Sequence, residues 1–391
     1  MGWPVHSESA SFVTASLNIL HIYRAPVGGL FRHVLDLARA QIARGHRVGM
    51  VADSLTGGAT AETTLRELEP SLALGLTRIP MRRHIGPGDL PALVHVTRRI
   101  AETRADVAHG HGAKGGAFTR MALGSRRTLR AYTPHGGSLL YGHDTLSGKF
   151  YLASERLLML RGDLFLFESA YSAEVFRRKV GTPKGLVRIV HNGVTRAEFE
   201  PVATAPDAAD LVFIGELRPV KGVDIFIDAI AQLHREGRKT SATLVGEGPD
   251  REALQTQVER LSLSDSIRFV GAMPARQAQT LGRIMVIPSL AESLPYVVLE
   301  TAAAGMPLIT TKVGGIPEIY GPRSDRLVPS QDPDALAKAI AQALDRPDAT
   351  IALAAELRDR VAQSFSVDSM VEGVLAAYRD GFENLRQSRR R

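Results

Sequence analysis

The chain has 391 residues, of which 44% are hydrophobic and 23% are charged, and its formal net charge is +7. This composition is ordinary for a globular protein, and the length exceeds the roughly 250–300 residues at which one core usually divides, so we expect two domains. The absence of cysteine excludes disulfides and thiolate metal sites, and no apolar run reaches the roughly 18 residues that would span a bilayer.

The first segment, residues 1–16, is mixed and polar. It lacks the charged start and long apolar core of a secretory signal, and His6 stands where a myristoylation motif requires Ser or Thr. We therefore expect a loose tail here and a cytoplasmic protein, which could act at the inner face of the membrane. The basic balance favours phosphate-bearing ligands or an anionic membrane over nucleic acid, because the sequence shows no RNA-recognition, zinc-finger or basic-zipper pattern.

Strand-like and helix-like segments alternate through residues 17–200. A first strand is predicted at 18–23, and a glycine loop and an amphipathic helix follow it. Further strands are predicted at 47–52, 76–80, 106–109, 130–133, 163–167 and 187–190. Strands that alternate with helices indicate a parallel, doubly wound sheet, so this part of the chain is predicted to form an N-terminal Rossmann-like domain.

The pattern breaks in the Pro- and Ala-rich stretch 199–210, which is typical of a linker. Residues 208–365 are predicted to form a second α/β domain, with strands at 211–214, 242–245, 267–270, 284–288, 308–310 and 326–328 and helices at 223–236, 250–261, 295–304, 334–344 and 351–363. In residues 366–391, an apolar stripe from Val367 to Leu385 predicts a last helix that packs back on the domains. A basic tail that could touch anionic lipid follows this helix.

The most informative stretch, residues 289–307, reads SLAESLPYVVLETAAAGMP. It places Glu292 and Glu300 eight positions apart around the start of an apolar helix that follows a strand. Ligands of open α/β sheets bind beyond the carboxyl ends of the strands, and the free N–H groups of a helix start suit a diphosphate. Carboxylates accept hydrogen bonds from hydroxyls. The pattern therefore indicates a nucleotide sugar as the ligand.

This stretch resembles the signature of glycosyltransferase family 4. Other short pieces follow in the order that the family shows, namely Gly28-Gly29, His135 in Tyr-Thr-Pro-His-Gly, His191-Asn192-Gly193-Val194, the run from Gly215 to Gly222, Gly246-Glu247-Gly248-Pro249 and Phe269-Val270-Gly271. The resemblance covers about residues 17–380. It implies the GT-B fold, in which two Rossmann-like domains face each other across a cleft. It also implies retaining, metal-independent transfer of a sugar from a nucleotide-diphosphate donor, with no cofactor.

Two basic residues, Arg218 and Lys221, are the predicted diphosphate binders. They follow a strand and lead into a helix, and transfer needs fixed positive charge where the leaving phosphate accumulates negative charge. The sequence departs from the family at Glu216, because many members carry Arg there. Arg218, two residues further on, could take over that role.

The resemblance also assigns the sugar and nucleoside contacts. Glu292 is predicted to accept hydrogen bonds from the donor sugar, Glu300 to hold the ribose hydroxyls, and His135 to contact the transferred sugar. Together with Arg218, Lys221, Glu292 and Glu300, the predicted donor-binding residues are Gly28, Gly29, Asn192, Gly215, Gly246, Val270, Ser293, Leu294, Tyr296 and Val297.

On the acceptor side, Arg82, Arg83 and His84 follow a first-domain strand and could meet a phosphorylated or lipid-linked acceptor. His111 and Lys114 lie in a glycine-rich segment that is predicted to line the same side of the cleft. His109 and His111 have a metal-like spacing, but two histidines without a nearby acid or cysteine make an incomplete ligand set, so no metal is predicted.

Several questions stay open from the sequence. The family suggests a glycan or lipid-linked acceptor and cell-envelope polysaccharide or lipopolysaccharide synthesis, but the donor base, the sugar and the acceptor are not specified. Same-face transfer and double displacement both remain possible. The alternatives are a GT-B-fold nucleotide-sugar epimerase or hydrolase and a two-lobe sugar-binding protein, which would bind free sugar but not a nucleoside diphosphate.

Overall fold

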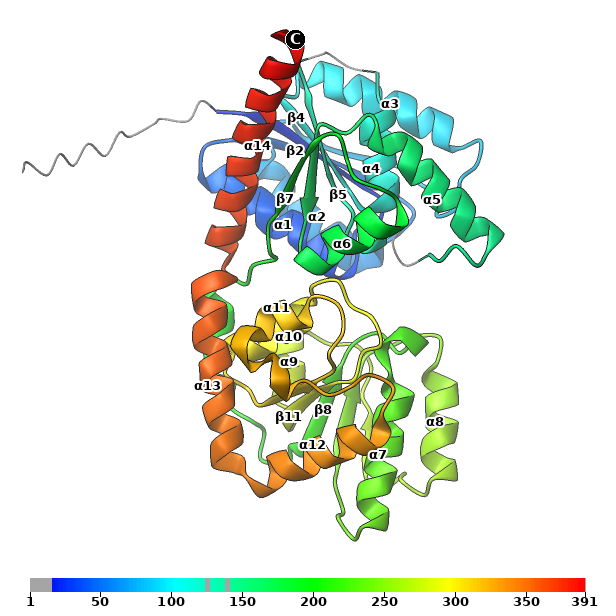
Figure 1. The fold of residues 1–391 in the computed structure, drawn as a ribbon, viewed down its shortest axis with the longest axis vertical. Helices are drawn as coiled ribbons and strands as arrows, with labels where there is room; N and C mark the ends of the chain where they lie inside the picture. The colour runs from blue at the N-terminus through cyan, green and yellow to red at the C-terminus, as the bar shows by residue number, and fades with distance from the viewer. Residues whose placement is uncertain (1–15, 124–126, 138–140, 391) are drawn as a thin grey trace, which may run out of the picture.

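The computed structural model describes residues 16–123, 127–137 and 141–390, and for residues 388–390 only the backbone (Figure 1). The tail predicted over residues 1–16 lies outside the described residues except for Ser16, and so do the side chains of the three C-terminal arginines. The described chain forms two α/β lobes, and each lobe is built on a parallel sheet. None of the described helices has the length and apolar character needed to span a bilayer.

The N-terminal lobe contains a seven-stranded parallel sheet in the order β3-β2-β1-β4-β5-β6-β7. Its strands are β1 Asn18–Tyr23, β2 Arg47–Asp53, β3 Leu76–Ile79, β4 Val107–His111, β5 Leu129–Thr133, β6 Leu164–Phe167 and β7 Leu186–Ile189. Its helices are α1 Gly28–Ala43, α2 Gly58–Leu68, α3 Asp89–Glu102, α4 Gly112–Met121, α5 Leu146–Met159 and α6 Ala170–Lys179. The strand order reverses between β1 and β4, which is where ligands of doubly wound sheets bind.

The C-terminal lobe repeats this plan with a five-stranded parallel sheet in the order β10-β9-β8-β11-β12. Its strands are β8 Ala209–Ile214, β9 Ala242–Val245, β10 Ile267–Phe269, β11 Gly282–Ile287 and β12 Leu308–Thr310. Its helices are α7 Val223–Arg235, α8 Arg251–Arg260, α9 Ala275–Gln279, α10 Tyr296–Ala303, α11 Ile316–Tyr320, α12 Pro333–Asp345 and α13 Pro347–Ser364. The alternating pattern of the sequence therefore predicted the fold class correctly.

One predicted strand, over residues 326–328, is wrong. Arg326 ends a 3-10 helix over Gly321–Arg326, and of the three residues only Val328 pairs with the sheet, through an isolated bridge to Thr311. Arg326 belongs to that helix, and Pro329 has no backbone N–H with which to continue the ladder, so these residues pack as part of a loop.

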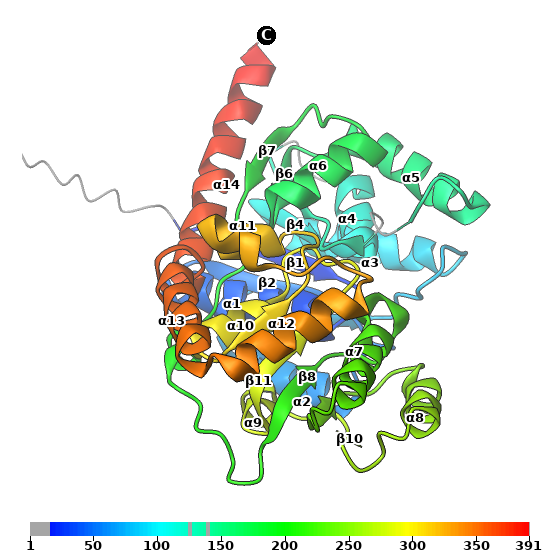
Figure 2. The same ribbon diagram turned by 60° about the horizontal axis from the view of Figure 1, so that its bottom comes forward.

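The last helix, α14 Val367–Arg390, returns to the N-terminal lobe. Its apolar stripe packs against the sheet of that lobe and shares a buried cluster with Ile19, Leu129 and Leu164. Figures 1 and 2 show α13 along one side of the C-terminal lobe and α14 along the same side of the N-terminal lobe. The chain thus crosses between the lobes twice, and the two crossings meet in a parallel bridge between Val194 and Ser366.

Candidate active site

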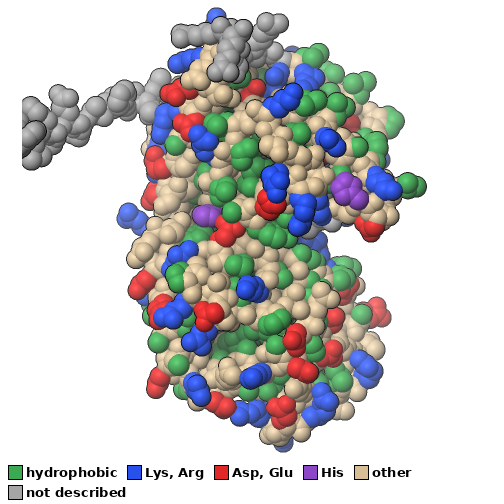
Figure 3. Space-filling view, viewed as in Figure 1, with side chains coloured by type: hydrophobic (Ala, Val, Ile, Leu, Met, Phe, Trp, Pro, Cys, Tyr) green, Lys and Arg blue, Asp and Glu red, His purple; other side chains and the backbone are tan. Residues whose placement is uncertain are grey.

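The carboxyl ends of both sheets point toward the border between the lobes. From the N-terminal lobe, the loops after β5, β6 and β7 bring His135, Glu168 and Asn192 to this border. From the C-terminal lobe, the loops after β8 and β11 bring Lys221 and Glu292. Figure 3 shows the molecular surface hollowed between the lobes on one side. Candidate site residues from both lobes therefore face one region.

Direct contacts between the lobes fix the position of the loop after β11. The hydroxyl oxygens of Ser172 and Ser293 lie 2.5 Å apart. The side-chain amide of Asn192 donates to the carbonyl of Leu294 at 2.9 Å. Asn192, Ser293 and Leu294, which were predicted from the sequence as donor-binding residues, thus also hold the two lobes together.

Lys221 and Glu292 form the central charged pair of the C-terminal lobe. The Nζ of Lys221 lies 2.6 Å from Oε1 of Glu292, and the hydroxyl of Ser289 donates to the same oxygen at 2.7 Å. Both charged side chains are mostly buried, with 19% and 11% of their surface exposed. Gly222 makes this geometry possible, because its φ is +64° and a Cβ there would lie 2.3 Å from the carbonyl oxygen of Pro288.

Arg218 lies at the surface beside this pair. Its Nε is 3.2 Å from Oε2 of Glu216, and its side chain is 42% exposed. Glu216 is the position at which the sequence departs from the family pattern, and in this chain its carboxylate pairs with the arginine that was predicted to take over the family's role. Arg218 is therefore less tightly held in one geometry than Lys221.

Glu300 lies on α10 and forms an ion pair with Arg32 of α1, across the lobe border. The same guanidinium pairs with Glu198 and with Asp36, and it lies 4.4 Å from the ring centroid of Tyr296. Three carboxylates thus converge on one arginine. The sequence did not indicate Arg32, because its position in the first helix gives no sign of a partner some 270 residues away. Binding of ribose hydroxyls by Glu300 stays a prediction.

The two predicted glycines Gly28 and Gly29 begin α1 at the border. Gly28 has a φ of +62°, and a Cβ on Gly29 would lie 3.3 Å from the ring of Tyr296. No side chain caps the start of α1 or of α10, so no side chain occupies the backbone N–H groups of either helix start. This arrangement suits an anionic group, which the positive ends of the helix dipoles would stabilise.

The other predicted donor-binding residues lie in neighbouring loops and at the start of α10. Gly246, with a φ of +145°, packs so closely on Gly215 that a Cβ would lie 1.8 Å from its carbonyl oxygen. Val270 donates its N–H to the carbonyl of Leu244, and Val297 is half-buried in the first turn of α10. The structure thus brings Gly215 and Gly246 into contact.

His135 lies at the carboxyl end of β5 with a φ of +51°, in the left-handed region that side chains other than glycine rarely adopt. Its Nδ1 is 3.5 Å from Oε1 of Glu168, which is buried. Burial alone would raise the pKa of Glu168, but the charge of His135 and its hydrogen bond hold that pKa below the usual range. Glu168 was not predicted from the sequence, although its place directly after β6 was a usable signal.

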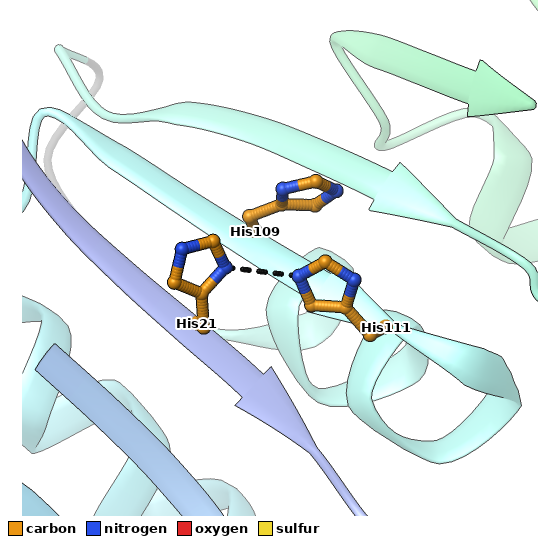
Figure 4. Close-up of side chains that lie close together, drawn as sticks. All are labelled: His21, His109 and His111. Carbon is orange, nitrogen blue, oxygen red and sulfur yellow. Dashed lines mark hydrogen bonds between the residues drawn. The ribbon is translucent and has the colours of Figure 1, made fainter. Parts of the chain in front are cut away.

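Four further histidines form a buried group with His135, namely His21, His33, His109 and His111, of which His33 and His111 contact it directly. The Nε2 of His111 lies 2.9 Å from Nδ1 of His21, and its Nδ1 lies 3.1 Å from Nε2 of His135. Figure 4 shows His21 on β1 and His109 and His111 on β4, with the bond between His21 and His111 dashed. Burial lowers the pKa of His21 to about 4 and that of His33 to about 3, so both rings are neutral at pH 7.

The predicted acceptor-side residues separate into two groups. Arg82 and Arg83 line a pocket together with Arg24, Asp53, Leu55, Thr56 and Met81. Lys114 instead pairs with Asp89 at 2.6 Å and donates to the carbonyl of His84. His111 is completely buried and bonded to other histidines. The pocket is therefore the part of this prediction that the structure assembles.

Comparison with known proteins gives two family matches that follow each other along the chain. The model described as "Glycosyltransferase Family 4" matches residues 27–198, and the one described as "Glycosyl transferases group 1" matches residues 208–346. The chain is similar to a component of the phosphatidylinositol N-acetylglucosaminyltransferase of Arabidopsis thaliana, with 26% identity over 81% of this chain and 71% of the relative. It is also similar to the D-inositol 3-phosphate glycosyltransferase of Acidothermus cellulolyticus, with 28% identity over 92% and 87%.

A solved structure shares the fold across nearly the whole chain. The Anabaena protein Alr3699/HepE, in complex with UDP-glucose, superposes with a TM-score of 0.77 at 20% identity, over 93% of this chain and 100% of that chain. The arrangement of two parallel sheets facing each other is therefore the GT-B fold, as the sequence predicted.

Proposed function

Since this chain belongs to glycosyltransferase family 4, of the group 1 type, and transfers a sugar as that family does, we propose that its donor is a nucleotide-diphosphate sugar and its acceptor a hydroxyl. We further propose that transfer retains the anomeric configuration and needs no divalent metal. The observation that carries this proposal is the Lys221–Glu292 pair at the lobe border, 2.6 Å across and mostly buried.

In the proposed mechanism, this pair and its neighbours have separate roles. Lys221 and Arg218 stabilise the negative charge that develops on the leaving diphosphate, together with the uncapped helix starts of α1 and α10. Glu292 and His135 orient the sugar by hydrogen bonds to its hydroxyls. The acceptor hydroxyl then attacks the anomeric carbon on the face from which the diphosphate leaves, while closure of the lobes excludes water.

Two further points support a nucleotide-sugar donor and an anionic acceptor. The solved structures of similar fold include complexes with UDP, with UDP and glucose, and with UDP-glucose. The pocket lined by Arg24, Arg82 and Arg83 supplies three cations beside apolar residues, which suits a phosphorylated or lipid-linked acceptor. The names of two relatives, which refer to phosphorylated inositol and phosphatidylinositol, agree with this chemistry.

We also propose that the protein acts in the cytoplasm, at the inner face of the membrane, in cell-envelope polysaccharide or lipopolysaccharide synthesis. A solved structure of similar fold is WaaG, a glycosyltransferase involved in lipopolysaccharide biosynthesis, with a TM-score of 0.69 at 18% identity. The outer face of α5 supports peripheral contact, because Leu146, Phe150, Leu157 and Leu160 are exposed there beside basic residues.

The test combines thermal shift with product analysis. Nucleoside diphosphates and their sugars should raise the melting temperature by mass action, and sugar transfer should persist in a chelator of divalent metals. Loss of turnover in the chelator would refute metal independence. Donor turnover that yields free sugar without an acceptor would favour a hydrolase, and stabilisation by free sugar alone would favour a binding protein.

A further inference from the structure

One arginine, Arg32, joins the two helices that begin at the lobe border. It lies on α1 in the N-terminal lobe, and its ion pair with Glu300 reaches α10 in the C-terminal lobe. Asp36 follows Arg32 by one turn of α1, and Tyr296 precedes Glu300 by one turn of α10. Because residues four positions apart share one face of a helix, the face of α1 with Arg32 and Asp36 meets the face of α10 with Tyr296 and Glu300.

Each nitrogen of the Arg32 guanidinium has its own carboxylate. Nε lies 3.3 Å from Oδ2 of Asp36, Nη2 donates to Oε1 of Glu198, and Nη1 pairs with Oε1 of Glu300. The guanidinium also lies over the ring of Tyr296, 4.4 Å from its centroid. A planar group with a partner at every nitrogen has a single orientation, so Arg32 can fix the position of a carboxylate that it binds.

Glu198 is itself held by local structure. It lies in the short 3-10 helix Arg196–Phe199, in the first crossing between the lobes. Its second oxygen, Oε2, accepts hydrogen bonds from the backbone N–H of Thr195 at 2.6 Å and from the Thr195 hydroxyl at 3.1 Å. Asp36 and Glu198 therefore hold Arg32 in place, and its remaining nitrogen, Nη1, is directed to Glu300 in the C-terminal lobe.

The carboxylate of Glu300 keeps hydrogen-bonding capacity for a ligand. Among the described residues, Arg32 is its only side-chain partner. The side chain is 14% exposed, so the carboxylate is mostly buried but can still be reached. An ionised carboxylate can accept about four hydrogen bonds, and the two neighbouring hydroxyls of a ribose can each donate one. Glu300 can thus bind Arg32 and a diol at the same time.

The excess of carboxylates distinguishes this group from an ordinary ion pair. Three carboxylates share one cation, and the exposed fractions of the four side chains are only 11–22%. Burial raises the pKa of Asp36, and the charge of Arg32 opposes that rise. One acid would balance Arg32, and desolvation of further charge is unfavourable. A neutral ligand that donates hydrogen bonds would compensate Glu300 for this cost without adding charge.

We propose that Arg32 is a positioning residue for the donor nucleoside, because it holds the carboxylate of Glu300 in the orientation that receives the 2′ and 3′ hydroxyls of the ribose. This inference rests on the proposed nucleotide-sugar donor and on the ribose contact predicted for Glu300. Arg32 and Glu300 belong to different lobes. The ribose contact is therefore complete only when the lobes are closed, so recognition of the nucleoside is linked to closure.

The experiment measures binding to the full chain by calorimetry, without turnover. ADP, CDP, GDP and UDP are each titrated beside their 2′,3′-dideoxy forms, and the tightest-binding diphosphate and its dideoxy form are used for the variants. Hydrogen bonds to a charged group are strong enough that the wild type should prefer the ribose form at least about tenfold. If none of the diphosphates binds, the proposed donor is wrong. Wild-type binding that does not distinguish the two forms would overturn this inference alone.

Variants then separate positioning from a merely structural contact. Arg32→Gln should reduce the preference for the ribose form to about twofold or less, because the hydrogen bonds to Glu300 lose their fixed geometry. Arg32→Lys keeps the charge without the planar fork and should give an intermediate preference. Glu318→Ala is the control, because Glu318 joins the lobes through α6 and His191. It should weaken the binding of both forms equally and keep the wild-type preference.

Circular dichroism should confirm that the variants are folded, and Arg32→Lys provides the more conservative change. A wild-type preference in both Arg32 variants, with equal weakening of the two forms, would show that Arg32 only connects the lobes. Tighter binding of the ribose form by Arg32→Gln would show that Arg32 competes with the ribose for Glu300. Either result would overturn the proposal.

Discussion

At the scale of single residues, the donor side of the site depends on one contact. Lys221 and Glu292 come from loops 71 positions apart, yet their charged atoms lie 2.6 Å apart. In a partly buried setting each charge holds the other in place, so that in the proposed mechanism Lys221 would meet the diphosphate and Glu292 the sugar from fixed positions. Preorganised charge of this kind stabilises a transition state without reorganisation at the moment of reaction.

Removal of either partner should therefore abolish transfer. We expect Lys221→Ala and Glu292→Ala to lower kcat at least about 10²- to 10³-fold, as for the loss of one preorganised electrostatic group, while far-UV circular dichroism stays unchanged. Asp345→Asn is the matched control, because it breaks the pair of Asp345 with Arg238, an exposed ion pair of the same lobe at 2.7 Å. Near-normal turnover in both alanine variants would refute the site assignment.

A second ion pair contributes to stability and not to the site. Arg120 and Glu155 are buried, with Nη1 and Oε1 2.8 Å apart, and the guanidinium lies 3.9 Å from the ring centroid of Tyr132. Arg120→Met leaves a buried carboxylate without this partner and should cost about 3–5 kcal/mol in urea unfolding. The double change with Glu155→Leu should regain most of that loss.

The control for this pair is Arg323→Gln, which removes an equally short but half-exposed pair with Glu356. Exposed pairs contribute about 0–1 kcal/mol, so the variant should unfold close to the wild-type midpoint. Equal destabilisation by Arg120→Met and Arg323→Gln would contradict the role given to burial.

The sequence singled out candidate site residues where a local motif carried them, as for Lys221, Glu292 and His135, and the structure places these three at the lobe border. It could not predict Arg32 as the partner of Glu300, or Glu168 as the partner of His135, because each pairing depends on how two distant elements pack. For the same reason, the sequence indicated only part of the buried histidine group. His109 and His111 stand out in the sequence, but His21 and His135 join them only through the order of β1, β4 and β5 in the sheet, and His33 only through the packing of α1.

At the scale of elements, α5 is unusual because two of its faces are apolar. Its inner face is buried through Leu152 and Met159. Its outer face exposes Leu146, Phe150, Leu157 and Leu160, beside the exposed basic residues Lys149, Arg156 and Arg161. Figure 3 shows hydrophobic and basic side chains side by side at the edge of the N-terminal lobe, where Figure 1 draws α5. The one acid of α5, Glu155, is buried.

This outer face should bind anionic vesicles. Burial of one large apolar side chain contributes about 1.5–3 kcal/mol, so Leu157→Glu should lower partitioning into phosphatidylglycerol vesicles about tenfold or more in a co-sedimentation assay. Ile351→Glu is the control, because Ile351 on α13 is similarly exposed, at 58% against 69% for Leu157. Equal binding by the wild type and Leu157→Glu would refute the membrane role of α5.

Most elements were predictable because both sheets are buried on two faces and their strands read as short apolar runs between helices. The same reasoning failed at residues 326–328, since an apolar run shows that residues are buried but not that they pair. The exposed face of α5 was not predicted either. Its leucines fit a buried helix equally well, and only the position of α5 at the edge of the lobe exposes them.

At the scale of the whole molecule, the two lobes depend on each other through the crossings at Val194 and Ser366. Helix α14 supplies Met370, Val371, Val374 and Tyr378 to the core of the N-terminal lobe, although it follows the C-terminal lobe in the sequence. The apolar stripe of α14 predicted that this helix packs on a domain, but the sequence could not say on which one. An apolar stripe shows that one face of a helix is buried, but it does not show which surface covers that face.

Glu318 joins the lobes from the other side and should control how far they open. From the C-terminal lobe, it accepts hydrogen bonds at 2.9 Å from the backbone N–H groups of Ala170 and Tyr171, at the start of α6, and it lies 3.1 Å from Nε2 of His191. A carboxylate at a helix start is stabilised by the helix dipole, so this contact favours closed lobes.

Glu318→Ala should therefore shift the molecule toward an open arrangement. We expect a larger radius of gyration by small-angle X-ray scattering and a higher KM for the donor, because part of the binding free energy must now close the lobes. Glu356→Ala, which removes an exposed acid of the same lobe, should change neither.

Burial opposes ionisation of Glu318, but the hydrogen bonds from His191, Tyr171 and Ala170 hold its pKa below the usual value of a glutamate, 4.5. The stabilisation of the closed lobes by ionised Glu318 should therefore be complete at neutral pH, and it should disappear as the pH falls below about 4.5. A wild-type radius that stays constant through this range, with no change in Glu318→Ala, would show that other contacts keep the lobes closed.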